Sequence, residues 1–393
     1  LVSSKIIALF LGPGGIALTG NLRDFQTLLD AFSTLGFQNG VIKYVAENEK
    51  DDKKLSKILT TVFATVFGVV IIMTLVLLLA SNYWSNEIFG SGNYSWIITI
   101  LALALPFYAG NVILVAVLNG LSRYNQVIKI NIIGNVIGVS LSAVLIWQFN
   151  IEGALLGVAI APALLFIFSF FALYKRFSKL TLFSRENYDA GSLKNFFSFS
   201  LMTLVTMSLG AFITIAIRNN LIDNYGLDQA GLWGAMNRLS VFYLMFASTL
   251  LTVYFLPKLS TAQTDKETKK IFWTYYKGVI PVFAIGLIII YFLKEFIVRL
   301  LFSKEFIPMT HLFSWQLLGD FLKVASMILG YEFFAKKMVK SFIIFELISY
   351  TTLYISSLYF IKLYGSEGAV MAHALTYLLY FMLLLFFFRK KLL

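Results

Sequence analysis

Apolar runs recur along almost the whole chain, and they constrain its fold more than any other feature. A run of about 20 apolar residues is long enough to cross a bilayer as an α-helix. Between polar breaks we find twelve apolar segments, at 1–11, 15–42, 58–80, 95–118, 127–149, 153–174, 195–217, 229–254, 272–293, 311–334, 341–361 and 366–388. The chain is only 13% charged, about half the share of a typical soluble domain. The pattern therefore predicts an all-α integral membrane protein with about twelve transmembrane helices.

The first segment, 1–11, is about half as long as a membrane crossing requires. The chain begins with Leu1 instead of a methionine, and the segment lacks the small-residue cleavage pattern of a signal peptide. We therefore expect a truncated first transmembrane helix, whose N-terminal half is missing.

Lysine and arginine are distributed unevenly between alternate loops of this arrangement. One set of loops holds 23 of the 32 cationic residues, and the other set holds four, which are Lys294, Arg299, Lys304 and Lys362. Because cytoplasmic loops carry an excess of Lys and Arg, we expect both termini in the cytoplasm. The net charge of +12 is then mainly an orientation signal, and we expect no nucleic-acid partner.

The second half of the chain repeats features of the first half at a constant offset. Residues 148–154, Gln-Phe-Asn-Ile-Glu-Gly-Ala, are echoed by residues 363–369, Leu-Tyr-Gly-Ser-Glu-Gly-Ala. The offset that takes Glu152 to Glu367 also takes Arg23 to Arg238. The alternative explanation is that Glu-Gly-Ala is merely a common start of a helix; the shared offset favours a true repeat.

The repeat predicts two lobes of six helices each. We place them at 1–180 and 181–393, joined by a polar linker around Lys175 to Lys194. Because six crossings return the chain to the same side of the membrane, the lobes are parallel repeats related by a pseudo-twofold axis along the membrane normal. Transporters built from such repeats bind their substrates in the cleft between them.

Several kinds of chemistry are excluded by composition. The chain has no cysteine and only two histidines, His311 and His373, so metal sites built from thiolates or imidazoles lack ligands. The P-loop motif G-x-x-x-x-G-K-[ST] does not occur, which argues against ATP hydrolysis by the chain itself. We expect no metal and no cofactor. For His373, on the last span, we favour a packing role over a proton relay.

Five cationic side chains fall inside the predicted spans and are the main candidates for substrate binding. They are Lys5, Arg23, Arg218, Arg238 and Lys323. A charge at the bilayer centre costs about 2.5–3.5 kcal/mol on insertion scales, so these residues should face the protein interior or a water-filled cavity. All five lie toward the outer ends of their spans, where we expect them to form one ring. Snorkelling or an interhelical ion pair is the alternative, and it is strongest for Arg218.

Acidic side chains also fall inside the spans, at Asp24, Asp30, Asp320, Glu332 and Glu346. Asp320 and Lys323 are three residues apart on one helix, close enough to form an ion pair. A pair of Lys5 with Asp24 is also expected. Asp24, Asp30 and Glu332, together with Asp320, are the candidate carboxylates for coupling transport to an ion gradient.

The basic residues of the predicted cleft favour an anionic ligand. A guanidinium binds phosphate oxygens through two parallel hydrogen bonds, and a low dielectric strengthens the attraction, so a phosphate or diphosphate is expected. A cation-coupled antiporter of small molecules or drugs is the alternative on the same scaffold, and it would require carboxylates at the midplane. An integral-membrane polymerase or ligase is a third possibility, against which the short outer loops argue.

Four groups of residues form recognisable motifs along the chain. They are Lys5-Ile6-Ile7-Ala8 with Leu11-Gly12-Pro13-Gly14-Gly15; Glu152-Gly153-Ala154-Leu155-Leu156-Gly157; Leu256-Pro257-Lys258-Leu259-Ser260; and Trp315-Gln316-Leu317-Leu318-Gly319-Asp320-Phe321-Leu322-Lys323-Val324. Together they resemble the Wzx-type flippases of O-antigen and enterobacterial common antigen synthesis, and most closely the lipid III flippase branch. The resemblance covers nearly the whole chain.

The resemblance implies a member of the multidrug/oligosaccharidyl-lipid/polysaccharide (MOP) exporter superfamily, whose two lobes form a V around a central cavity. Such proteins are flippases, not enzymes. By alternating access they move undecaprenyl-diphosphate-linked oligosaccharide from the inner to the outer leaflet of the bacterial inner membrane. The family's cavity positions map onto Arg23, Arg218, Asp320 and Lys323, whereas Arg238 has no matching position. The implied partners are the lipid-linked oligosaccharide, membrane lipid, and polymerase and chain-length proteins of the glycan pathway.

Overall fold

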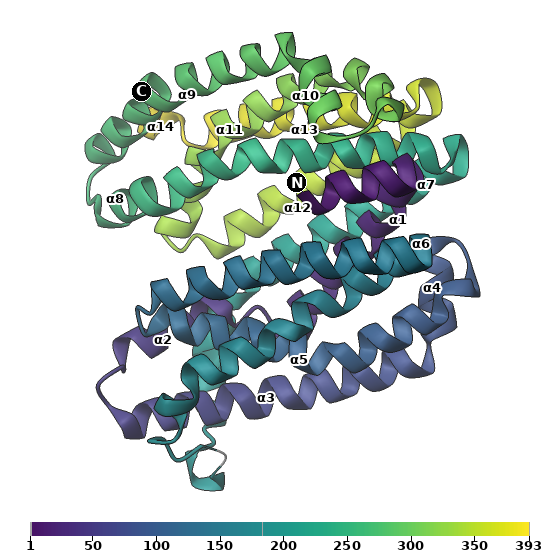
Figure 1. Ribbon diagram of the computed structural model, residues 1–393. Coiled ribbons are helices and arrows are strands. Elements are labelled where there is room, and N and C mark those ends of the chain that lie inside the picture. The colour runs from purple at the N-terminus through teal and green to yellow at the C-terminus, as the bar shows by residue number, and fades with distance from the viewer. Residues whose placement is uncertain (1, 183, 393) are drawn as a thin grey trace. The chain divides into compact units, whose positions relative to one another are not determined.

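The computed structural model describes residues 2–182 and 184–392, apart from the side chains of 185, 190 and 192–199, and it is built of helices (Figure 1). Among the residues described there is no β-strand. The linker cations Arg185 and Lys194 lie outside the described side chains.

The α-helices are α1 (Val2–Ser33), α2 (Gln38–Glu47), α3 (Asp52–Leu79), α4 (Ser81–Phe89), α5 (Ser95–Gly120), α6 (Tyr124–Phe177), α7 (Ala190–Leu250), α8 (Leu256–Thr261), α9 (Asp265–Phe292), α10 (Lys294–Leu301), α11 (Phe313–Ala335), α12 (Val339–Tyr364), α13 (Ser366–Phe387) and α14 (Arg389–Leu392). The 3₁₀ segments are η1 (Gly92–Tyr94), η2 (Arg185–Asn187) and η4 (Lys304–Leu312), and a π-helical segment, η3 (Leu251–Phe255), joins α7 to α8.

Nine helical stretches of the described chain are long and apolar enough to cross a membrane. Three of them, in α1, α6 and α7, contain one residue with non-helical backbone angles, which is Gly12, Asn150 and Gly226 respectively. Each of these residues divides its helix in two, so the nine stretches hold twelve apolar segments. The all-α membrane fold and the segment number expected from hydropathy are confirmed.

The divisions fall on residues suited to a left-handed backbone. The φ angle is 61° at Gly12, 83° at Gly226 and 49° at Asn150. Glycine has no Cβ to obstruct a positive φ, and asparagine adopts it more readily than most residues. In α6 the chain folds back at Asn150, since a Cβ on Gly157 would lie 3.3 Å from Ser142 Oγ and one on Gly138 would lie 4.0 Å from Ala161 Cβ.

The predicted repeat is present in the backbone. Asn150 and Gly365, which correspond to each other in the repeat, both have positive φ, at 49° and 58°. Three positions after each comes a glycine, Gly153 or Gly368, where an added Cβ would overlap the backbone of the preceding helix. The same local fold therefore occurs twice at the offset found in the sequence, which agrees with a two-lobe repeat.

The chain divides into two compact units. We call residues 18–212 the N-unit, and residues 1–17 together with 213–393 the C-unit. The beginning of the chain thus groups with its second half. The lobe boundaries at 1–180 and 181–393 stay predictions.

In the N-unit, α5 packs against α2, α3 and α6. Polar side chains fasten the second part of α1 to its neighbours. Asn21 Nδ2 donates to the carbonyl oxygen of Ile88 at 2.7 Å, and Gln26 Nε2 donates to that of Val158 at 2.9 Å. Ser169 Oγ donates to Asn111 Oδ1 at 2.6 Å and so links α6 to α5. The buried amides of Asn21 and Gln26 position the helix that carries Arg23, Asp24 and Asp30.

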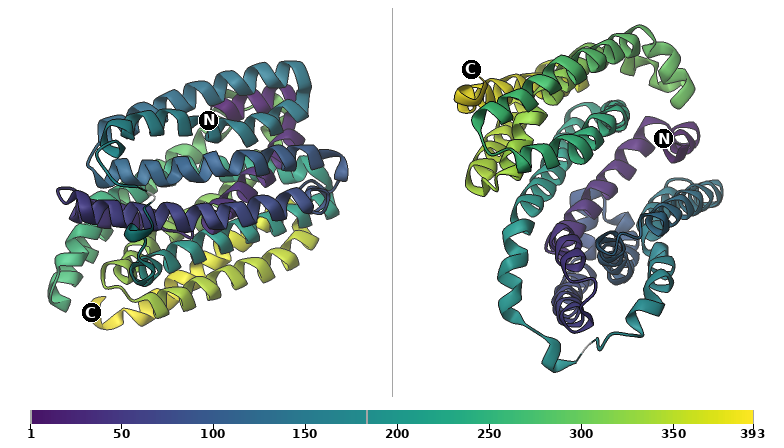
Figure 2. Two further views of the ribbon diagram at one scale, coloured as in Figure 1. Left: turned by 90° about the horizontal axis from the view of Figure 1, so that it is seen from below. Right: turned by 90° about the vertical axis from the view of Figure 1, so that its left-hand side faces the viewer.

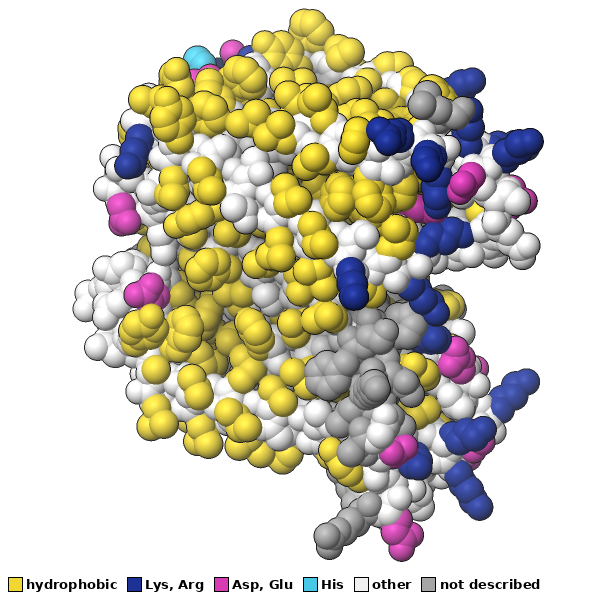
Figure 3. Space-filling model, turned by 180° about the vertical axis from the view of Figure 1, so that it is seen from behind, with side chains coloured by type: hydrophobic (Ala, Val, Ile, Leu, Met, Phe, Trp, Pro, Cys, Tyr) yellow, Lys and Arg dark blue, Asp and Glu magenta, His cyan; other side chains and the backbone are white. Residues whose placement is uncertain are grey.

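In the C-unit, α13 packs against both α11 and α12, and α11 also packs against α9 (Figure 2). Apolar side chains cover much of the C-unit surface in the upper half of Figure 3, with Lys and Arg gathered at one end. Phe292 is 78% exposed and Val282 is 70% exposed, as befits side chains that face lipid. Lys336 Nζ donates to the carbonyl oxygen of Ala262 at 2.5 Å.

Candidate functional site

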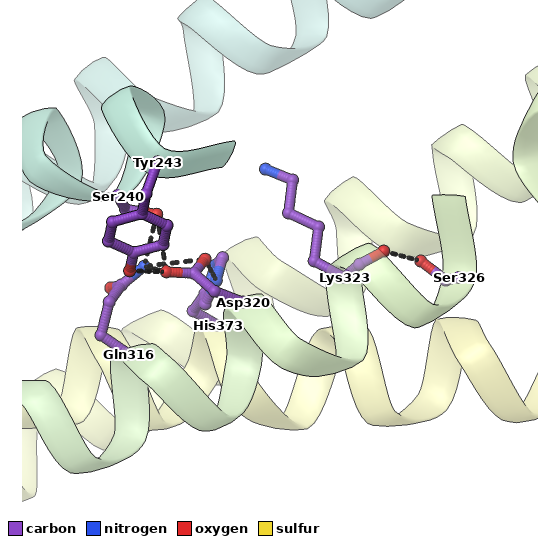
Figure 4. Close-up of polar contacts among 7 residues, drawn as sticks. All are labelled: Ser240, Tyr243, Gln316, Asp320, Lys323, Ser326 and His373. Atoms are coloured by element: carbon purple, nitrogen blue, oxygen red, sulfur yellow. Dashed lines mark hydrogen bonds and ion pairs between the residues drawn. The ribbon is translucent and has the colours of Figure 1, made fainter. Parts of the chain in front are cut away.

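Asp320 lies at the centre of a buried polar cluster in the C-unit, and its side chain is fully buried (Figure 4). Oδ1 is 2.9 Å from His373 Nε2, and Oδ2 accepts a hydrogen bond from Ser240 Oγ at 2.7 Å. Tyr243 Oη also donates to Oδ2, and Gln316 Nε2 lies 3.2 Å from each carboxylate oxygen. The cluster therefore joins α7, α11 and α13 through one carboxylate.

Helical spacing explains how the cluster forms. Gln316 and Asp320 are one turn apart on α11, and Ser240 and Tyr243 are three apart on α7, so each pair shares a helix face. Gly319 lets α13 approach α11, because a Cβ there would overlap the His373 ring and lie 3.1 Å from the backbone of Ala374. The glycine thus places the imidazole beside Asp320.

Lys323 does not pair with Asp320, contrary to the expectation from their spacing. Its ammonium lies 5.1 Å from the ring centroid of Tyr377, and Figure 4 marks no contact between it and the carboxylate. Within the described residues, the ion-pair partner of Asp320 is His373. The imidazole of His373 is thus hydrogen-bonded to a carboxylate, and the preference for packing over a proton relay stays a prediction.

Aromatic hydroxyls continue the cluster toward α12. The Tyr377 ring contacts the rings of His373 and Tyr380, with centroids 4.9 and 6.2 Å apart. Tyr380 Oη donates to Glu346 Oε1 at 3.4 Å. Lys323 thus lies among tyrosines, with Asp320 and Glu346 as the acidic side chains near it.

Arg218 is buried, with 4% of its surface exposed. Its guanidinium carbon lies 5.5 Å from the ring centroid of Trp233. Both residues are on α7, on opposite sides of the division at Gly226, so the two segments bring them together. A tryptophan face attracts a guanidinium and leaves the edges of the group, with their N–H donors, for other partners.

Arg238 and Lys5 both contact backbone carbonyls within the C-unit. Arg238 donates to Ser4 Oγ at 3.2 Å and to the carbonyl oxygen of Ile16 at 3.4 Å. Lys5 Nζ donates to three carbonyl oxygens at the C-terminal end of α10, those of Arg299, Leu300 and Phe302, at 3.2, 2.9 and 2.5 Å. Lys5 thus caps α10, where unsatisfied carbonyls attract a cation, and its pair with Asp24 stays a prediction.

Two of the candidate coupling carboxylates also have partners. Asp30 accepts from Gln38 Nε2 at 3.3 and 3.2 Å, which joins α1 to α2. Glu332 is fully buried and lies 2.7 Å from Lys391 Nζ at the basic end of the C-unit. Arg23 and Asp24 are half-buried on α1 of the N-unit. Glu332 therefore belongs to an ion pair that ties the C-terminal end of the chain to α11.

Sequence reasoning found the charges of the site but missed several of their neighbours. Ser240, Tyr243 and Trp233 carried no signal of their own, because serine and aromatic residues are common in membrane helices. Gln316 did carry a signal in the sequence, because it precedes Asp320 by one helical turn. Among the described residues no group of His, Asp and Glu is arranged to hold a metal ion.

The chain shares its fold with solved structures of membrane transporters. The chain superposes on the inward-facing conformation of a multidrug resistance MATE family transporter of the MOP superfamily with a TM-score of 0.86, covering 100% of this chain and 93% of that one at 12% identity. It also matches the inward closed conformation of the lipid II flippase MurJ with a TM-score of 0.78, covering 99% and 86% at 16% identity. At these identities the likeness shows the fold alone.

Residues 1–263 match the model of a family described as polysaccharide biosynthesis protein, and the chain belongs to that family. Two curated relatives are similar over nearly the whole chain. They are the lipid III flippases of Escherichia coli (strain K12) and Shigella flexneri, each 32% identical over 383 residues, which are 98% of this chain and 92% of the relative.

Proposed function

We propose that this protein is a flippase that moves undecaprenyl-diphosphate-linked oligosaccharide from the inner to the outer leaflet of the bacterial inner membrane. The observation that carries the proposal is its 32% identity, over 98% of the chain, to lipid III flippases. The likeness extends over both predicted lobes. Cationic side chains within the apolar helices of both units supply the charge that a diphosphate requires.

The diphosphate is the part of the substrate that the cations bind. Arg218, supported by Trp233, presents a guanidinium in a low-dielectric environment, where its attraction for phosphate is strong. Arg23 and Arg238 are the other arginines that bind the diphosphate. Lys323, beside Asp320, contacts the head group or its first sugars. The contacts of Lys5 and Glu332 favour structural roles for these two residues.

Transport proceeds by alternating access of the two lobes and needs no covalent chemistry. The polyprenyl tail stays in lipid, while the charged head and its sugars pass through the protein. Both termini face the cytoplasm, because the basic loops do. Polymerase and chain-length proteins of the glycan pathway receive the product on the other side.

A cation-coupled antiporter is the second candidate function. The buried pair of Asp320 and His373 favours it, since such a pair can exchange a proton. The identity to the MATE family transporter is only 12%, whereas the flippase relatives are 32% identical to the chain. The flippase is therefore the better-supported candidate.

The test is complementation of a flippase-null bacterium by the full-length gene, compared at matched membrane expression. Variants are Arg218→Ala, Arg23→Ala, Trp233→Ala and Trp233→Phe, with Arg389→Ala as the control. Arg389 is an exposed arginine at the C-terminal end, so its loss removes the same charge without touching the site.

We expect wild type and Arg389→Ala to restore surface glycan, and both site arginine variants to fail. Trp233→Phe should be more active than Trp233→Ala, because a phenyl ring retains part of the cation–π attraction, which is worth about 0.5–2 kcal/mol. If the site arginine variants complement as well as wild type, the arginines are structural. If wild type itself does not complement but exports a cationic dye, the antiporter is correct.

A further inference from the structure

The carboxylate of Asp320 is saturated by neighbours other than Lys323. An ionised carboxylate has about four lone-pair sites. Here His373 and Gln316 contact Oδ1, and Ser240, Tyr243 and Gln316 contact Oδ2. The nearest lysine on the same helix therefore has no acceptor site left to occupy, although a spacing of three residues is within its reach.

Within the cluster, His373 takes the place beside the Asp320 carboxylate that a lysine or arginine could otherwise occupy. Ser240, Tyr243 and Gln316 are neutral donors, whereas an imidazole can carry a positive charge beside the carboxylate. A buried carboxylate without a nearby cation is costly, and an ion pair is the usual remedy. Without the imidazole, the cation placed to pair with Asp320 would be Lys323, one helical turn away on α11.

We infer that His373 is a positioning residue, which occupies Asp320 and thereby keeps the Lys323 ammonium available for an anionic lipid head group. The inference rests on the proposed function for the identity of that head group, a diphosphate. The contacts within the C-unit carry it: His373 Nε2 lies 2.9 Å from Asp320 Oδ1, while the Lys323 ammonium lies 5.1 Å from the ring centroid of Tyr377, and Figure 4 marks no contact between that ammonium and the carboxylate. His373 thus acts on the substrate only through Asp320 and Lys323.

The other charged and titratable groups around Lys323 agree with this role. Glu346 on α12 accepts a hydrogen bond from Tyr380, and Tyr377 on α13 lies under the ammonium. A tyrosine face attracts an ammonium without neutralising it. Among the described residues neither Glu346 nor Asp320 forms a direct ion pair with Lys323, which rests against the Tyr377 ring.

A double-mutant comparison tests the inference on the full-length protein in lipid nanodiscs. The variants are His373→Leu, Asp320→Asn, His373→Leu with Asp320→Asn, and His373→Gln. Asparagine at 320 carries no charge, so Lys323 has no carboxylate at that position to pair with even when the imidazole is missing. Glutamine at 373 can still donate to Oδ1, so it serves as the conservative variant.

Two readouts distinguish a positioning role of His373 from a packing role. They also test the positioning role independently of the identity of the substrate. The first is the ¹³C resonance of reductively methylated Lys323, assigned by its loss in Lys323→Gln, which reports on ion pairing without any ligand. The second is binding of undecaprenyl diphosphate. We expect His373→Leu to shift the resonance and weaken binding about tenfold or more, and the double variant to recover both. His373→Gln should lie between wild type and His373→Leu, because glutamine keeps a donor to Oδ1 but carries no charge.

Two results would overturn the inference. One is a Lys323 resonance that does not move in His373→Leu. The other is a double variant that binds as weakly as His373→Leu, which would mean that the ring acts by packing. If the resonance moves and recovers but wild type does not bind undecaprenyl diphosphate, the positioning role stands and the proposed substrate is wrong.

Discussion

Gly153 and Gly368 occupy equivalent places in the internal repeat, each against the backbone of the helix that precedes it. A Cβ on Gly153 would overlap the carbonyl group of Leu145, and one on Gly368 would overlap that of Phe360. Both glycines follow a residue with positive φ by three positions. Each hairpin is closed by a backbone contact that only glycine permits.

Alanine at either glycine should therefore destabilise the protein to a similar extent. We expect Gly153→Ala and Gly368→Ala to cost about 1–3 kcal/mol each, since the backbone must move. Gly278→Ala is the control: Gly278 lies inside α9 with nothing within 4 Å of an added Cβ, so the higher helix propensity of alanine should leave Tm unchanged or raise it. Thermal unfolding in detergent gives the comparison. Equal Tm values for all three variants would contradict the hairpin contacts.

Removing the ammonium of Lys5 should affect stability more than transport. Three carbonyls at the end of α10 lose their donor in Lys5→Met, and we expect a loss of about 1–2 kcal/mol. Lys5→Arg, which retains a cation, should lose less. The measurements are Tm and complementation at matched expression. A Lys5→Met protein that is as stable as wild type but does not transport would show that Lys5 binds substrate and has no structural role.

The buried pair of Glu332 and Lys391 predicts a specific order of stabilities. Lys391→Met leaves the fully buried Glu332 without its ion-pair partner, so it should be the least stable variant, at a cost of about 3–5 kcal/mol. Glu332→Gln with Lys391→Met removes both charges and should be more stable than Lys391→Met alone. Denaturation of the purified variants tests the order. A double variant no better than Lys391→Met would show that the ion pair contributes little.

The orientation of the chain can be measured directly because it has no cysteine. Lys266 lies at the start of α9 and Lys304 begins η4, and both are exposed at opposite ends of the C-unit. With both termini in the cytoplasm, Lys304→Cys should react with a membrane-impermeant maleimide added outside spheroplasts, and Lys266→Cys only after lysis. The reverse pattern would invert the topology.

Much of the fold follows from the sequence, because the signal for a membrane helix is local. Runs of about 20 apolar residues predict the segments, and the glycines and Asn150 mark where helices divide. The repeat is legible because its two copies keep Glu-Gly-Ala after the turns at Asn150 and Gly365. These features depend on neighbours in the chain and need no tertiary information.

The site was less predictable because its partners are distant in sequence. Lys323 and Asp320 are neighbours on one helix, yet His373, 53 residues away, takes the carboxylate. Lys5 finds its acceptors 294 residues and more along the chain. Periodicity indicates which charges are buried, but which donor reaches a carboxylate depends on how helices pack.

The grouping of residues 1–17 with 213–393 has a consequence for biosynthesis. The segment that carries Lys5 enters the membrane early, but the carbonyls it caps, those of Arg299 to Phe302, are translated far later. During that interval the ammonium must be held by water, lipid phosphate or the insertion machinery. The packing of residues 1–17 is therefore completed only after α10 has been synthesised, which makes this segment one of the later parts of the C-unit to fold.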